Sequence, residues 1–114
     1  MSLYRKNLGT SGEKLARSYL VANKFEILKK NFRSKFGEID IIAKKYNCIY
    51  FIEIKTRSND RYGKPYEAVN FRKINHIQKA ADYFLLKNPL RNLKLKLAVI
   101  SIQLDINEIK FFEL

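Results

Sequence analysis

The sequence predicts a mixed α/β domain, in which a central mixed sheet of about five strands is flanked by helices in the order αβββαββ. Two observations predict this class. Short runs rich in Ile, Phe and Tyr recur along the chain, and two longer stretches between them carry apolar residues at helical spacing. The 114 residues contain no internal repeat, low-complexity segment or linker, so residues 1–114 are expected to form a single domain.

The first helix is expected over residues 10–24, TSGEKLARSYLVANK, where Ala16 and Leu20 belong to an apolar face. Thr10 and Glu13 have the spacing of a capping box, which would begin the helix at this point. Glu13 also borders the apolar face, so its side chain could reach the sheet on which the helix packs. Both interpretations of Glu13 stay open, and they do not exclude each other.

Three strands should follow the first helix. Residues 25–33, FEILKKNFR, alternate weakly between apolar and polar side chains, whereas GEIDIIAKK (37–45) and CIYFIEIKTR (48–57) are dense in strand-forming residues. Tyr46 and Asn47 stand between the two stronger runs and are expected to form the turn of a hairpin.

The second half of the chain predicts one long helix and two more strands. Ser, Asn, Asp and Gly in SNDRYGK indicate a loop over residues 58–64, and Pro65 suits the first turn of a helix that ends near Asn88. The last two strands are expected at residues 95–104 and 108–114, on either side of a turn at 105–107.

The composition is strongly basic, with 23 Lys and Arg residues against 11 Asp and Glu, a net charge of +12 and a pI of about 9.9. A polyanion partner is therefore expected, with nucleic acid favoured over an acidic membrane surface. Cys48 is the only cysteine, which excludes an internal disulfide, and no apolar run approaches the length of a bilayer span. We therefore expect a cytoplasmic protein without a membrane segment. A single histidine argues against a zinc site, and the sequence has no glycine-rich phosphate loop.

Two acidic residues occupy the middle of the strongest predicted strands. If the hairpin folds about Tyr46 and Asn47, the register places Asp40 directly across from Glu53, with their Cβ atoms about 4.5–5.5 Å apart. Like charges in that arrangement destabilise a sheet, whereas a divalent cation such as Mg²⁺ binds carboxylate oxygens. Lys55 shares the face of Glu53, where its ammonium could orient water or stabilise charge on a phosphate. The alternative is that Asp40, Glu53 and Lys55 have no catalytic role and form a cross-strand salt bridge on a solvated face of the sheet.

Four segments resemble the YraN-like family of bacterial proteins: SGEKLARSYL, NFRSKFGEIDIIAK, YFIEIKTRSNDRYGKPYEAV and KINHIQKAADYFL. The match runs from about Gly12 to Phe84. That family in turn resembles the PD-(D/E)XK nucleases, and the archaeal Holliday junction resolvases in particular. The resemblance implies a restriction-endonuclease-like core and a Mg²⁺- or Mn²⁺-dependent nuclease, with DNA favoured over RNA as the substrate.

The resemblance also implies a role for each matched position. Glu13 corresponds to the acid of the first helix, Asp40 to the motif aspartate, and Glu53 with Lys55 to the E-x-K half of the motif. The backbone carbonyl of Ile54, between those two, would be a further metal ligand. Two departures stand out: Ile39 replaces the nominal proline of the motif, and the late strand starts with KLKLAVISI where the family usually has an aspartate.

Basic residues near these positions are candidates for phosphate contacts. Arg57 leaves the strand of Glu53, and Arg33 precedes the strand of Asp40. Arg72 lies on a polar face of the long helix, with Lys73 beside it. The resulting hypothesis is a metal-dependent endonuclease that cleaves DNA, including branched or structured DNA. Action on a junction would call for a homodimer that places two sites on one substrate. The alternatives are a non-catalytic nucleic-acid-binding module that keeps the same fold, and a nuclease that acts on RNA.

Overall fold

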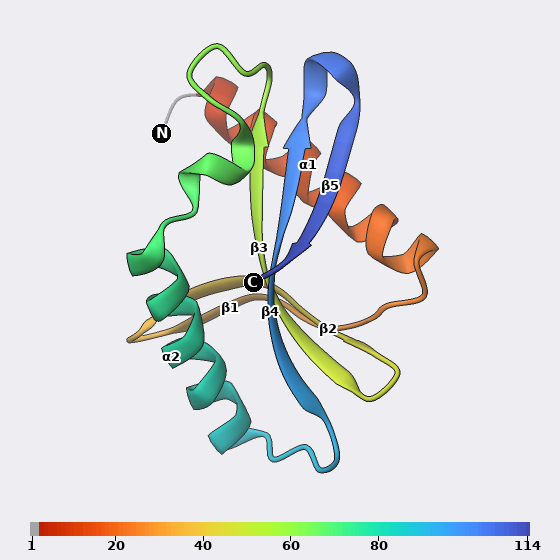
Figure 1. Ribbon diagram of the computed structural model, residues 1–114, viewed down its shortest axis with the longest axis vertical. Coiled ribbons are helices and arrows are strands. Elements are labelled where there is room, and N and C mark those ends of the chain that lie inside the picture. Colours follow the sequence, from red (N-terminus) through yellow and green to blue (C-terminus); the bar gives the residue numbers. More distant parts are fainter. Residues whose placement is uncertain (1–2) are drawn as a thin grey trace.

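The computed structural model describes residues 3–114, which form a five-stranded sheet with one helix on each face (Figure 1). In chain order the elements are α1 (Leu3–Ala22), β1 (Glu26–Ser34), β2 (Gly37–Lys45), β3 (Cys48–Arg57), η1 (Pro65–Ala68), α2 (Phe71–Lys87), β4 (Lys94–Gln103), η2 (Leu104–Ile106) and β5 (Glu108–Glu113). The predicted order αβββαββ is confirmed, and two short 3₁₀ turns, η1 and η2, are added to it. Over the described residues, neither helix is long and apolar enough to cross a membrane.

The sheet is mixed, as predicted. Its strand order is β1-β2-β3-β4-β5, in which β3 and β4 run parallel and the other neighbours run antiparallel. A parallel pair needs a long crossover connection, and the segment that contains η1 and α2 supplies it. The strongest predicted strands, 37–45 and 48–57, have the predicted bounds, and the hairpin between them turns at Tyr46 and Asn47.

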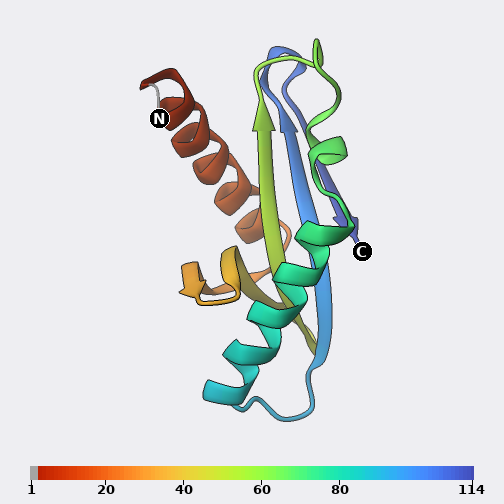
Figure 2. The ribbon, with the colours of Figure 1, turned by 90° about the vertical axis from the view of Figure 1, so that its left-hand side faces the viewer.

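Each face of the sheet has its own apolar core. Ala16 and Leu20 of α1 are fully buried against one face, and Ile77 and Phe84 of α2 are buried against the other. The two helices therefore cover opposite faces of the sheet, and Figure 2 shows α1 to one side of β3 and β4 and α2 in front of them. The far end of the β1–β2 hairpin bends toward α2, and Phe32 packs edge-to-face on Phe84 with ring centroids 5.2 Å apart.

Two predicted helix starts are wrong. Helix α1 begins at Leu3, so Thr10 lies inside the helix and the capping-box interpretation of Thr10 and Glu13 fails. Glycine lowers helix propensity, so Gly9 and Gly12 led to a prediction that the helix starts later than it does. Pro65 opens the separate turn η1, whereas α2 is capped by Asn70, whose side-chain oxygen accepts a hydrogen bond from Lys73 N at 3.0 Å.

Candidate functional site

The site lies where β2 and β3 separate. Their backbone pairing runs from Lys45–Cys48 to Ile41–Ile52, which is the predicted register, and it ends one position before Asp40 and Glu53. Beyond this point a side chain takes the place of the backbone acceptor, because Asp40 Oδ2 accepts a hydrogen bond from Ile54 N at 2.7 Å. The predicted direct pairing of Asp40 with Glu53 is therefore wrong. Instead, the backbone N–H of Ile54, the residue after Glu53, donates a hydrogen bond to the Asp40 carboxylate.

An irregularity in β1 and β2 explains the position of Asp40. Along β2, Ile41 packs in the core beneath α1, whereas both Ile39 and Ile42 pack in the core beneath α2. Residues of a regular strand alternate between faces, so the alternation is reset at Asp40. On β1 the opposite residue is Asn31, which lies between two paired positions and has a left-handed backbone with φ of 52°. Asn31 and Asp40 therefore interrupt the regular pairing of β1 and β2, and the Asp40 carboxylate reaches Ile54 of β3.

Glu53 is almost fully buried and is neutralised by two lysines. Its Oε1 atom lies 3.4 Å from the ammonium of Lys55, on the same strand, and 3.4 Å from that of Lys73, at the start of α2. A buried carboxylate without such partners would cost several kcal/mol. The predicted neighbourhood of Glu53 and Lys55 is confirmed, and Lys73 belongs to the same charge cluster.

The two acids are electrostatically coupled. Burial, and after it the negative charge of Glu53, raise the pKa of Asp40 from 3.8 to about 7. The hydrogen bond from Ile54 and the charges of Lys55 and Lys73 act against this rise without cancelling it. Near neutral pH, Asp40 is therefore poised to release a proton when a cation approaches.

Glu13, on α1, shares a cavity with Asp40 and Lys55, and Glu53 is not among the described residues that line it. Asp40, Lys55 and Glu13 line one cavity of about 760 Å³, which we call the α1–β3 cavity; its other lining residues are Leu8, Gly9, Thr10, Asn31, Arg33, Ile54 and Thr56. Glu13 Oε1 accepts a hydrogen bond from Asn31 Nδ2 at 3.1 Å. The interpretation of Glu13 as a helix-capping residue is therefore wrong, and its side chain faces the sheet, which was the second interpretation.

The donor set suits a hard cation. Carboxylate and carbonyl oxygens are the ligands of Mg²⁺ and Mn²⁺, and Mg²⁺ is typically held by one or two carboxylates together with water and substrate phosphate. Among the described residues, no group of three or more His, Cys, Asp or Glu side chains is close enough to hold a metal ion. Glu13 therefore lines the cavity but does not form a metal-binding group together with Asp40 and Glu53.

The four basic residues predicted to bind nucleic acid occupy different surroundings. Arg33 lines the α1–β3 cavity and forms an exposed ion pair with Glu38, with 3.1 Å between Nε and Oε1. Arg72 is exposed at the start of α2, and Lys73 contacts Glu53. Arg57 turns to its own loop, because its guanidinium donates hydrogen bonds to the carbonyls of Tyr62 and Gly63 at 2.7 and 3.1 Å.

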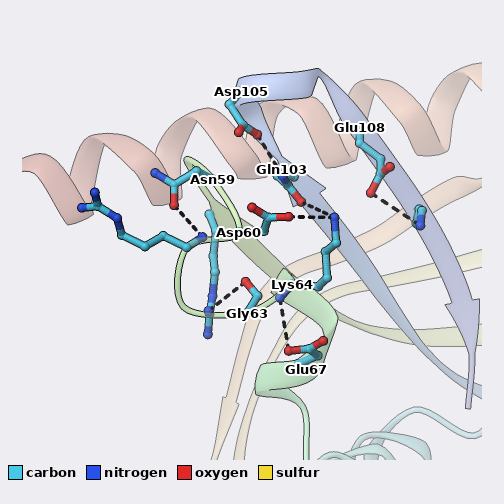
Figure 3. A network of polar contacts seen from close by, with 11 residues as sticks. Asn59, Asp60, Gly63, Lys64, Glu67, Gln103, Asp105 and Glu108 are labelled. Carbon is cyan, nitrogen blue, oxygen red and sulfur yellow. Dashed lines mark hydrogen bonds and ion pairs between the residues drawn. The ribbon is translucent and has the colours of Figure 1, made fainter.

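A polar network that the sequence analysis missed fixes the loop after β3 (Figure 3). The ammonium of Lys64 lies 3.1 Å from Asp60 Oδ2 and 3.4 Å from Oε1 of Gln103, and Gln103 Nε2 donates to Asp105 Oδ1 at 3.0 Å. Gln103 is 2% exposed, and a lone amide at the end of the apolar run LAVISI is the signal that could have revealed it. The network ties the loop to the end of β4, beside the strand that carries Glu53 and Lys55.

The five-stranded mixed sheet and its two helices are compatible with a restriction-endonuclease-like core. Residues 12–106 match the model of the uncharacterised protein family UPF0102, the YraN-like family, and the chain belongs to this family. A UPF0102 protein of Clostridium botulinum strain 657 is 48% identical over 92 residues, which cover 81% of this chain and 75% of the relative. A UPF0102 protein of Clostridioides difficile strain 630 is 46% identical over 99 residues, which cover 87% of each chain. A third, from Caldicellulosiruptor saccharolyticus, is 39% identical over 106 residues, which cover 92% of this chain and 90% of the relative.

Proposed function

We propose that this protein is a Mg²⁺- or Mn²⁺-dependent endonuclease that hydrolyses phosphodiester bonds in DNA, with branched or otherwise structured DNA as the favoured substrate. One observation carries the proposal: two coupled carboxylates, on Asp40 and Glu53, lie beside the ammonium of Lys55 where two strands separate. A protein that only binds nucleic acid gains nothing from acidic groups that repel each other and phosphate. The net charge of +12 supports a polyanionic substrate.

The residues have distinct roles in this proposal. Asp40 and Glu53, with the backbone carbonyl of Ile54, would hold the cation, and Glu13 would support the site from the cavity wall. A divalent cation bound there would polarise a phosphoryl oxygen and stabilise the negative charge that develops in the transition state. Lys55 has three N–H donors, with which it can orient the attacking water and hydrogen-bond a non-bridging phosphate oxygen. The water oxygen forms a bond to phosphorus as a bridging P–O bond breaks, which leaves a phosphate monoester and a hydroxyl end.

The test is a cleavage panel of single-stranded, duplex, flap and four-way DNA, together with a structured RNA, with Mg²⁺, with Mn²⁺ and with EDTA. Wild-type protein is expected to cut at least one DNA substrate, and only when the metal is present. Asp40→Asn and Glu53→Gln should lose cleavage at least a hundredfold, and Lys55→Ala should lose cleavage while it keeps affinity for DNA. The matched control is Asp82→Asn, which alters an exposed aspartate of α2 that accepts a hydrogen bond from Gln78.

Two results would overturn the proposal. Cleavage by Asp40→Asn and Lys55→Ala at the wild-type rate would remove the catalytic assignment. Tight DNA binding without cleavage of any substrate in the panel would favour the non-catalytic binding module, and cleavage of RNA alone would reassign the substrate.

A further inference from the structure

A second hollow lies along the seam between α1 and β1, and we call it the α1–β1 groove. It has a volume of about 810 Å³, and its charged lining residues are all basic among the residues that the structure describes: Lys14 and Arg17 from α1, and Lys30 from β1. The remaining wall is formed by small and apolar side chains, which include Ser18 and Ile27. A concave surface with one sign of charge concentrates counter-ions of the opposite sign.

The groove and the α1–β3 cavity lie along the same two elements, because residues of α1 and β1 line both. Glu13 and Asn31 line the cavity, and their chain neighbours Lys14 and Lys30 line the groove. Arg17 follows Glu13 by four residues, about one helical turn, which corresponds to a rise of about 6 Å along α1. Since a duplex strand carries one phosphate per roughly 3.4 Å of axis, the groove lies within about two nucleotides of the cavity.

Arg17 carries an unused hydrogen-bond donor. Its Nε atom is buried and has no hydrogen-bond partner among the described residues. A buried donor without a partner typically costs about 1–3 kcal/mol, so such a group calls for an explanation. A phosphate oxygen would be a suitable acceptor if the Arg17 side chain turned its buried Nε atom toward the groove, because the guanidinium forms short, charge-assisted bonds with phosphate.

We propose that the α1–β1 groove binds the phosphate backbone of the nucleic-acid strand next to the segment held in the α1–β3 cavity. The choice of nucleic acid as the polyanion rests on the proposed function. The position of the two hollows along α1 and β1 favours a linear chain of phosphates over the headgroups of an acidic membrane, because a single strand can follow both. Lys14, Arg17 and Lys30 contact phosphates, fix the register of the strand and carry no sequence information.

The experiment measures the affinity of the full chain for a fluorescent 20-nucleotide single strand and for a four-way junction in EDTA, over 50–300 mM salt. The groove variant is Lys14→Gln/Lys30→Gln. Its matched control is Lys87→Gln/Lys94→Gln, which removes the same charge from two exposed lysines at the end of α2 and the start of β4. A single variant, Arg17→Gln, accompanies them, and thermal unfolding checks that each protein is folded.

The plot of log affinity against log salt should become shallower by about 0.7–0.9 for each phosphate contact that is lost, or about 1.4–1.8 for the groove variant. The control should keep the wild-type slope. Equal slopes for the groove variant and its control would overturn the inference. So would loss of binding to anionic phosphatidylserine vesicles in the groove variant when the affinity for nucleic acid is unchanged.

These outcomes separate the groove from the nuclease. If wild type cleaves no substrate but the groove variant has a reduced salt slope, the groove is supported and the proposed catalysis fails. If wild type cleaves DNA and the groove variant keeps the wild-type slope, the catalysis is supported and the groove fails.

Discussion

Asp40→Asn should stabilise the protein when no metal is present. In the folded protein the pKa of Asp40 is raised from 3.8 to about 7, first by burial and then by the charge of Glu53. The folded state therefore binds more protons than the unfolded chain between these two values, and its stability falls as the pH rises through this window. The shift of about 3 pKa units corresponds to roughly 4 kcal/mol of lost stability once the carboxylate is ionised, above about pH 8.

Asparagine removes the charge and keeps the shape. Its side-chain oxygen can still accept the hydrogen bond from Ile54 N, which Asp40 Oδ2 accepts at 2.7 Å in the wild type. We therefore expect Asp40→Asn to be a few kcal/mol more stable than the wild type at pH 9 in EDTA, with the difference shrinking toward zero near pH 4. Mg²⁺ at a hundred times its Kd should narrow this difference, because it adds about 2.7 kcal/mol to the wild type and nothing to a variant that does not bind it.

Urea unfolding followed by far-UV circular dichroism measures this effect, since the chain has no tryptophan to report on it. Asp82→Asn, at an exposed position, should stay within about 0.5 kcal/mol of the wild type at every pH. A lower stability for Asp40→Asn at pH 9, or a difference that does not change with pH, would refute the argument that the two acids destabilise the metal-free fold.

Two further predictions concern the packing around the α1–β3 cavity. Gly12→Ala should destabilise the protein by about 1–3 kcal/mol, because an added Cβ would clash with Thr56. Gly9→Ala should stabilise it by about 0.5–1 kcal/mol, because nothing lies within 4 Å of a Cβ added there. Equal unfolding free energies for the two variants would contradict the close approach of α1 to β3. Asn31→Ala should cost about 1–2 kcal/mol, because its φ is 52° and its hydrogen bond to Glu13 is lost, whereas Asn31→Gly should cost less because glycine tolerates that backbone. A larger loss for glycine than for alanine in the same urea titration would show that the left-handed backbone is not the cause.

The order of the elements and the central hairpin could be predicted from the amino-acid pattern alone. Residues 37–45 and 48–57 could be placed to the residue, because dense β-branched and aromatic runs on both sides of a two-residue turn leave little freedom in register. The same register placed Asp40 near Glu53 and put Lys55 on the face of Glu53, since side-chain direction in a strand follows from counting residues.

How these groups meet depends on packing between segments that are distant in the chain. The reset of the alternation at Asp40 depends on the left-handed backbone of Asn31 in the neighbouring strand. The contact from Lys73 to Glu53 depends on how α2 packs across the sheet, and the position of Glu13 depends on how α1 packs on the other face. These distances join segments that are far apart in the chain, and no local pattern encodes them. The groups that can bind a metal or a phosphate can be identified in the sequence, whereas long-range packing sets the distances between them.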